Sequence, residues 1–139
     1  MTLDDIVRYF DTMTPASVAG LGRVYTEDAF FKDPFNEVRG IAAIEDIFRR
    51  MYVPLIDPRF AVVNRIASES QAMLEWDFHF RIRRYRPDVV QTVHGVSHLR
   101  FAADGRIDYH RDYWNTAEEL YAKLPLIGGV IRFLRHRMG

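Results

Sequence analysis

The sequence predicts an α+β domain in which a cone-shaped, curved antiparallel sheet wraps around three N-terminal helices and is followed by a C-terminal helical tail. Helical periodicity is confined to roughly the first 50 residues, and apolar residues then alternate with polar ones until about residue 114. Helices and antiparallel strands that are segregated along a chain pack as α+β layers. A length of 139 residues suits a single domain over 1–139, with a core over about 3–116 and a tail over about 117–139.

Three helices are expected ahead of the sheet. In residues 3–13, apolar side chains recur three and four apart, after acidic residues that favour a first helical turn. A second helix is expected to open at Pro15 and to run to about Tyr25, and a third to follow Gly40 and end before Pro54. Between these two helices, residues 29–33 have the pattern of a short strand.

Four strands are then expected as a meander, over residues 60–66, 71–85, 89–101 and 107–114. Asp104-Gly105 supplies a hairpin turn between the last two strands, and Asn115-Thr116 caps a final helix. The apolar stretch 124–131 is expected to cover a pocket mouth or to pack on a partner chain, because it is too apolar to stay in water.

The composition excludes several classes of protein. Lys plus Arg and Asp plus Glu balance at 19 each, which argues against binding nucleic acid or an anionic membrane. The arginines of residues 81–86 are interpreted as a solvated hairpin loop. There is no cysteine, no run of roughly 18 apolar residues and no apolar signal region, so we expect a soluble, cytoplasmic protein.

Histidine spacing does not predict a metal site. His94 and His98 share one face of a strand but are about 13 Å apart along it, too far to share an ion. No metal and no cofactor are therefore expected. Aromatic residues make up 14% of the chain, which suits the lining of a cavity for a small hydrophobic ligand.

Four segments resemble the ketosteroid-isomerase and SnoaL-like branch of the nuclear-transport-factor-two-like (cystatin-like) superfamily. They are the Tyr-Thr-Glu-Asp-Ala phrase at 25–29, the Asp-Pro that ends the strand at 33–34, the Gly-Ile-Ala-Ala-Ile helix opening at 40–44, and Ser-His-Leu-Arg-Phe at 97–101 before an Asp-Gly turn. The resemblance implies the cone-shaped fold and a homodimer through the outer sheet face. It leaves the reaction open, since this fold hosts isomerases, dehydratases, cyclases, epoxide hydrolases and binding modules.

The resemblance also implies site residues. The general base of ketosteroid isomerases corresponds to Asp33, and their tyrosine donor on the first helix corresponds to Tyr9. Ser97 stands where those enzymes hold a protonated carboxylic acid, and Phe48 replaces a pocket tyrosine. In SnoaL-type polyketide cyclases the acid–base aspartate comes late in the sheet, at a position that Asp112 matches.

Further residues are expected to face the same pocket. His110 lies two residues before Asp112 on one strand, so the two side chains point the same way about 7 Å apart. Trp114 follows on that strand. Leu74, Trp76, Phe78 and Phe80 are expected to line one wall.

Three functions stay open. The protein can be an enzyme in which Asp33 or Asp112 is the base and Tyr9, with Ser97 or His110, stabilises an oxyanion next to a carbonyl. It can be a binding module that uses the same groups only for orientation. It can also be an interaction domain whose cavity is filled by its own aromatic rings. Each polar residue also has a structural interpretation: a turn for Asp33, core packing for Tyr9, and an ion pair with an arginine for Asp112.

Overall fold

The computed structural model of the chain describes residues 1–121. The order of elements is α1 (Leu3–Asp11), the 3₁₀ helix η1 (Ser17–Arg23), β1 (Tyr25–Lys32), β2 (Glu37–Arg39), α2 (Ile41–Met51), β3 (Leu55–Ala67), β4 (Gln71–Ile82), β5 (Gln91–Phe101), β6 (Ile107–Tyr113) and the short π-helix η2 (Ala117–Tyr121). The apolar stretch 124–131 lies outside the described residues.

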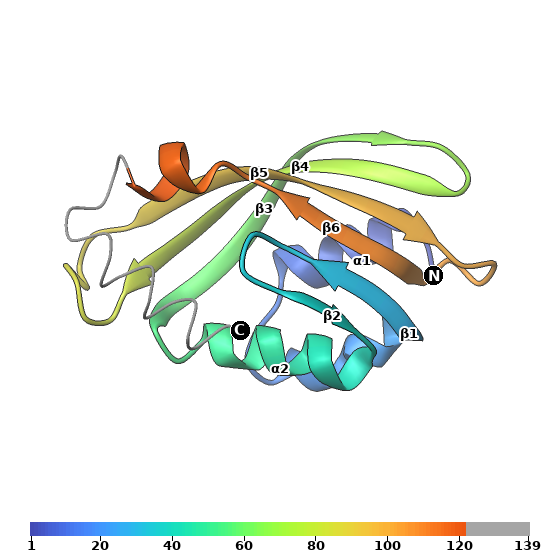
Figure 1. The fold of residues 1–139 in the computed structure, drawn as a ribbon, viewed down its shortest axis with the longest axis horizontal. Coiled ribbons are helices and arrows are strands. Elements are labelled where there is room, and N and C mark those ends of the chain that lie inside the picture. Colours follow the sequence, from blue (N-terminus) through green and yellow to red (C-terminus); the bar gives the residue numbers. More distant parts are fainter. Residues whose placement is uncertain (122–139) are drawn as a thin grey trace.

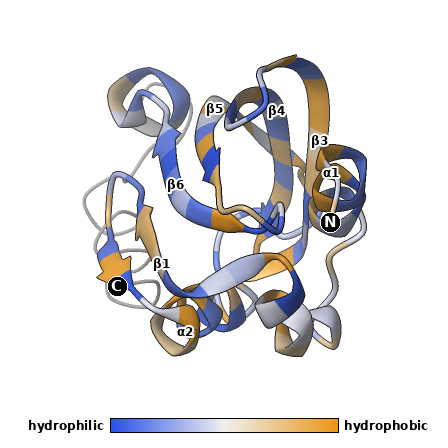
Figure 2. Cartoon of the chain, turned by 90° about the vertical axis from the view of Figure 1, so that its right-hand side faces the viewer, coloured by the Kyte–Doolittle hydropathy of each residue, from blue (hydrophilic) through white to orange (hydrophobic). Residues whose placement is uncertain are grey.

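The six strands form one curved sheet in the order β2-β1-β6-β5-β4-β3. Figures 1 and 2 show the sheet curling over α1 and α2, which lie on its concave side. In Figure 2 the hydropathy alternates along β4 and β5, as expected for strands with one covered face. The α+β class and the curved sheet around the N-terminal helices are therefore confirmed.

The prediction of a wholly antiparallel sheet is wrong at one place. β1 pairs with β6 in parallel, whereas every other neighbouring pair of strands is antiparallel. The pairing joins Phe31 to His110 across 79 residues of sequence, and it is interrupted by a register shift between Tyr25 and Phe30. Strand direction at such a long-range contact follows from the path of the whole chain and has no local sequence signal.

The limits of the second helix and of strands β1 to β3 differ from the predicted ones. β1 begins at Tyr25 rather than at residue 29, because the second helix ends earlier as a 3₁₀ helix that contains Gly20 and Gly22. β2 was not predicted, since three residues carry too little periodicity. β3 begins at Leu55, before Pro58, because it is an edge strand with an irregularity between Ile56 and Arg59 that accommodates a proline.

The helices are fixed by caps and by apolar faces. A capping box joins Thr2 and Asp5 at the start of α1, which buries Ile6, Val7 and Phe10. Similarly, α2 buries residues on one face, Ile44, Ile47, Phe48 and Met51. Both faces pack on the concave side of the sheet, so the side chains of α1 and α2 close the open side of the curved layer.

The outer face of the sheet holds the two histidines whose spacing bears on a metal site. His94 contacts Asp77 through Nδ1 (2.8 Å) and Glu75 through Nε2 (2.9 Å), whereas His98 contacts Gln71. Within residues 1–121, no group of three His, Cys, Asp or Glu side chains is placed to hold a metal ion. The same part of the chain contains no helix that is long and apolar enough to cross a membrane.

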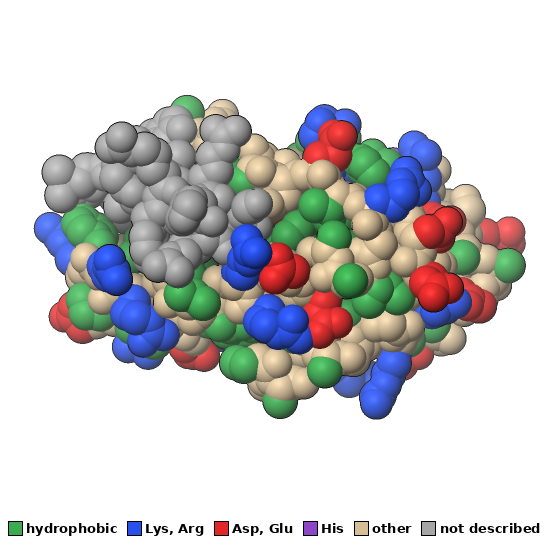
Figure 3. Space-filling view, turned by 60° about the horizontal axis from the view of Figure 1, so that its bottom comes forward, with side chains coloured by type: hydrophobic (Ala, Val, Ile, Leu, Met, Phe, Trp, Pro, Cys, Tyr) green, Lys and Arg blue, Asp and Glu red, His purple; other side chains and the backbone are tan. Residues whose placement is uncertain are grey.

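Charges of both signs are mixed on the α2 side of the molecule. On the α2 side, shown in Figure 3, Lys and Arg side chains alternate with Asp and Glu side chains, and hydrophobic side chains lie between them. The homodimer and the cytoplasmic location stay predictions.

Candidate functional site

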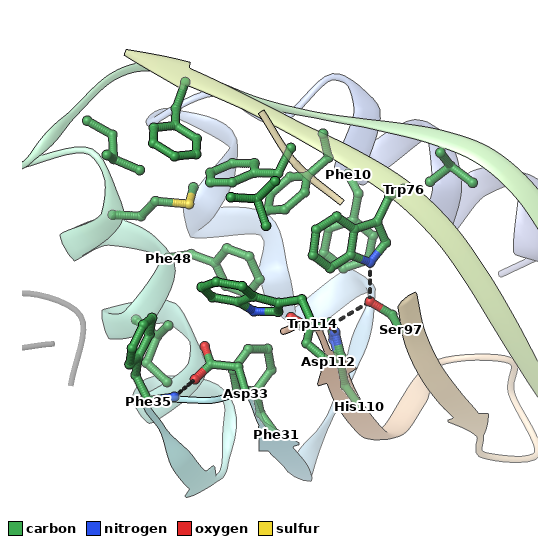
Figure 4. Close-up of a pocket in the computed structure, with 18 residues that line it drawn as sticks. Phe10, Phe31, Asp33, Phe35, Phe48, Trp76, Ser97, His110, Asp112 and Trp114 are labelled. Carbon is green, nitrogen blue, oxygen red and sulfur yellow. Dashed lines mark hydrogen bonds and ion pairs between the residues drawn. The ribbon is translucent and has the colours of Figure 1, made fainter. Parts of the chain in front are cut away.

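A cavity of about 100 Å³ lies between the concave face of the sheet and helices α1 and α2. Figure 4 shows the 18 side chains that line it. Nine are aromatic, five are aliphatic and four are polar: Phe10, Phe31, Phe35, Phe48, Phe60, Trp76, Phe78, Phe80 and Trp114; Ile47, Met51, Leu55, Val62 and Val93; and Asp33, Ser97, His110 and Asp112. Trp76, Trp114 and Phe48 line the cavity without filling it.

The cavity adjoins a wider opening of about 490 Å³ at the end of β1 and β6. Asp33, Asp112 and Trp114 line both spaces, together with neighbours on the outer side that include Lys32 and Arg111. Figure 4 shows the two carboxylates at the same end of the cavity, with hydrocarbon side chains at the opposite end. A ligand that enters through the opening would therefore meet the carboxylates first.

A chain of hydrogen bonds holds Asp112. Ser97 Oγ donates to Asp112 Oδ1 over 2.5 Å, and His110 Nε2 lies 2.6 Å from the same oxygen. Trp76 Nε1 donates to Ser97 Oγ (2.8 Å), and the Tyr25 hydroxyl lies 2.6 Å from His110 Nδ1. These contacts span β1, β4, β5 and β6, so the position of Asp112 depends on the whole sheet.

The partners of His110 determine its tautomer. Because Asp112 Oδ1 is a carboxylate oxygen, His110 Nε2 must carry the hydrogen of that bond. Burial, together with the charge of Asp112, raises the pKa of Tyr25 well above its usual value, so the phenol keeps its proton and donates to Nδ1. The Tyr25 ring also stacks on the imidazole at 7°. The arrangement suits an imidazole that donates from Nε2 to Asp112 and accepts at Nδ1 from Tyr25.

Asp33 has a different environment. Its Oδ1 accepts hydrogen bonds from the backbone N–H of Phe35 (2.8 Å) and Asn36 (2.7 Å) and from the Asn36 side chain. Burial, followed by the negative charge of Asp112, raises the pKa of Asp33, although these hydrogen bonds oppose the shift. Asp33 therefore forms the turn between β1 and β2 and also faces the cavity.

The structure corrects the position of Tyr9. Its hydroxyl donates to the backbone oxygen of Ser17 over 2.6 Å, and the residue is not among those that line the cavity. The α1 residue that reaches the cavity is Phe10, the next in sequence. The hydroxyl of Ser97 and Nε2 of His110 are likewise engaged with Asp112, so all three predicted oxyanion donors already have partners within the protein.

The other predicted residues are brought together at the cavity. The cavity lining contains eight of them: Asp33, Asp112, His110, Ser97, Phe48, Trp76, Phe78 and Trp114. Leu74 is buried but lies outside the lining. The pairing of Asp112 with an arginine is not observed, since its hydrogen-bonding partners among the described residues are Ser97 and His110.

Sequence reasoning missed Tyr25 and Gly95. Tyr25 reaches His110 only because β1 lies beside β6. Gly95 lies opposite Trp76 on the neighbouring strand, and a Cβ atom there would lie only 2.5 Å from Trp76 Cη2. The one available signal for Gly95 was its place inside a predicted strand, where a glycine often marks a site at which another group approaches the backbone closely.

The variant Asp33→Asn is expected to be more stable than the wild-type protein at neutral pH. Asn keeps the Oδ1 acceptor for the turn and removes the cost of burying a charge near Asp112, which outweighs the loss of the longer 3.2 Å contact between Oδ2 and Asn36 Nδ2. Because native Asp33 retains its proton to higher pH than the unfolded chain, the wild type should regain stability as the pH falls through the raised pKa towards 3.8. Urea unfolding at several pH values measures this; a less stable variant at pH 7 would contradict it.

Comparison with known proteins supports the architecture. None of the curated proteins matches this chain. Among solved structures, a protein with a ketosteroid isomerase-like fold from Catenulispora acidiphila, in complex with trimethylamine, superposes with a TM-score of 0.73 at 15% identity, covering 90% of this chain and 96% of that one. A protein proposed to be a polyketide cyclase from Pseudomonas putida gives 0.70 at 15% identity, covering 90% and 99%.

An LEH-like epoxide hydrolase from M. tuberculosis superposes with a TM-score of 0.68 at 16% identity, covering 95% of this chain and 89% of that one. At such identities these structures establish the shared fold alone. The family is established by sequence, because the model of the SnoaL-like domain matches residues 6–110, well over half of the chain. The protein with this curved sheet and carboxylate-bearing cavity belongs to the SnoaL-like domain family.

Proposed function

We propose that this protein is an acid–base enzyme that removes a proton from a small ligand with a largely apolar body, and that Asp112 is its general base. The observation that carries the proposal is the orientation of one carboxylate by two donors at the end of an aromatic cavity. His110 and Ser97 both contact Oδ1, and no described residue hydrogen-bonds to Oδ2. The second oxygen is therefore the one available to take a proton.

The surroundings of Asp112 suit this role. A base works best when its geometry is preset and water is largely excluded, because little reorganisation then accompanies proton transfer. The side chain of His110 is 6% exposed and that of Asp112 is 17% exposed. Asp33 is less suited to be the base, since both of its oxygens accept hydrogen bonds within the turn: Oδ1 from three donors, and Oδ2 from Asn36 Nδ2 over 3.2 Å.

Asp33 is proposed as the second member of an acid–base pair. Two carboxylates near each other cannot both ionise without cost, and the environment of Asp33 favours its protonated form more than an ordinary aspartate. In this scheme Asp112 receives the proton from the ligand, and Asp33 offers a site from which a proton can be returned. The names of the structural relatives, which include a proposed cyclase and an epoxide hydrolase, support small-molecule chemistry of this general kind.

Base activity can be tested without the natural substrate, using 5-nitrobenzisoxazole. A carboxylate takes the proton from C3, the C–H electron pair forms the C≡N bond, and the N–O bond breaks to give a coloured 2-cyano-4-nitrophenolate. The wild-type protein should give saturable kinetics, with a second-order rate constant at least about 100-fold above that of acetate ion. A rate that matches acetate at equal carboxylate concentration would reject the enzyme and favour a binding module.

A further inference from the structure

The polar groups of the cavity are unevenly divided between donors and acceptors. Three of the lining donors are already engaged: Ser97 donates to Asp112, Trp76 donates to Ser97, and His110 Nε2 donates to Asp112. The capacity that remains is mainly for accepting, on Asp112 Oδ2 and on Asp33 Oδ2, which also accepts from Asn36 Nδ2 over 3.2 Å. Among the described lining residues, the indole N–H of Trp114 is the side-chain donor that has no hydrogen-bond partner. A ligand that matches this site must therefore bring donors or positive charge.

The charge of the lining leads to the same requirement. Both ionisable carboxylates lie at one end of the cavity, and none of the described residues that line it is Lys or Arg. The two cationic side chains at the opening have other contacts. Lys32 Nζ lies 3.1 Å from Glu37, and the Arg111 guanidinium lies 4.8 Å from the centre of the Tyr113 ring. Among the described residues, neither cavity carboxylate therefore forms an ion pair with Lys or Arg.

The remaining surface of the cavity is also suited to a cation. Nine of the 18 lining residues are Phe or Trp. Aromatic faces attract organic cations through the ring quadrupole, and the attraction strengthens where water is excluded. The volume of about 100 Å³ matches a compact head group, since a cavity of about 150 Å³ in another protein holds benzene.

We propose that the ligand of this cavity is a small organic ammonium ion, held between the carboxylates of Asp33 and Asp112 and the aromatic wall. The inference rests on the proposed function in that it places the ligand at the same site as the base. A bound ammonium ion also favours the ionised form of Asp33, because its positive charge offsets the repulsion between the two acidic groups. The charge of Asp112 is one cause of the raised pKa of Asp33, which is the expected sign of that repulsion.

The test compares choline with 3,3-dimethyl-1-butanol, which has the same shape and hydroxyl group but a carbon atom in place of the charged nitrogen. Binding to the full-length protein is measured by calorimetry and by competition with 5-nitrobenzisoxazole. Choline should bind at least about tenfold more tightly than the neutral alcohol. Equal affinities, or tighter binding of the alcohol, would overturn the inference.

Substitutions of the two carboxylates test whether they cause the preference for choline over the neutral alcohol. Asp33→Asn and Asp112→Asn should each reduce the ratio of the two affinities, and the double variant should abolish it while still binding the alcohol. Asp108→Asn, at an exposed position of the same strand as Asp112, should keep the full ratio. A ratio that survives in the double variant would place the cation elsewhere and reject the proposed site.

The outcomes separate this inference from the proposed function. If 5-nitrobenzisoxazole is turned over but choline has no advantage, the base is supported and the cationic ligand is rejected. If choline binds with the predicted preference but the benzisoxazole reacts no faster than with acetate, the ligand class is supported and the base is rejected.

Discussion

Replacing Asp112 by Asn is expected to lower the rate of benzisoxazole opening by about 10²- to 10⁴-fold, the range usual for the loss of a positioned general base. Asn keeps a carbonyl oxygen that can accept from Ser97 and His110, so the hydrogen bonds that place the side chain can persist. The amide has no basic oxygen to receive the proton. We therefore expect kcat to fall much more than the affinity for the probe, as measured by steady-state kinetics.

Asp108→Asn is the matched control for this experiment. It makes the same chemical change on β6, four residues away, at an exposed position. Its rate should stay within about twofold of the wild-type rate. Near-wild-type activity in Asp112→Asn would reject Asp112 as the base, and a simultaneous loss in Asp33→Asn would then assign the role to Asp33. Thermal unfolding of each variant shows whether a lost rate reflects a lost fold.

Gly95→Ala is expected to destabilise the protein by about 1–3 kcal/mol, the usual cost of overpacking a filled core. The added Cβ would lie 2.5 Å from Cη2 and 2.7 Å from Cζ2 of the Trp76 indole. Trp76 cannot yield freely, because its Nε1 donates to Ser97 and its ring packs edge-on against Phe60. The indole must therefore move into the cavity or give up its hydrogen bond, and ligand affinity should fall together with stability.

Denaturant unfolding and ligand titration measure the two effects of Gly95→Ala. Gly20→Ala is the control, since its added Cβ would meet Tyr9 Cε2 at an ordinary 3.9 Å, and its stability should change little. Adding Trp76→Phe to Gly95→Ala should restore part of the lost stability, because the smaller ring leaves room for the methyl group. Full stability in Gly95→Ala alone would show that the indole does not fix the cavity wall.

Local patterns account for what the sequence predicted well. The apolar faces of α1 and α2 and the alternation along β4 and β5 arise from neighbours within a few residues, so periodicity is enough to find them. Alternation also places His110 and Asp112 on the same face of β6, and the structure joins them at 2.6 Å. The Asp-Pro signal at residues 33–34 identified both a turn and a carboxylate that faces the cavity.

The sequence by itself determined the class of fold, the family resemblance and the strand faces that carry Asp112, His110 and Trp76. Only the tertiary structure decided that β1 joins β6 in parallel, that Tyr25 reaches His110 across 85 residues, and that Tyr9 donates to Ser17 outside the cavity. The reason is physical: side-chain alternation is a property of each strand, whereas the partner of a side chain depends on which strands meet and in what register. The cavity depends on this pairing of strands, because its lining combines residues from both α-helices and from β1, β3, β4, β5 and β6.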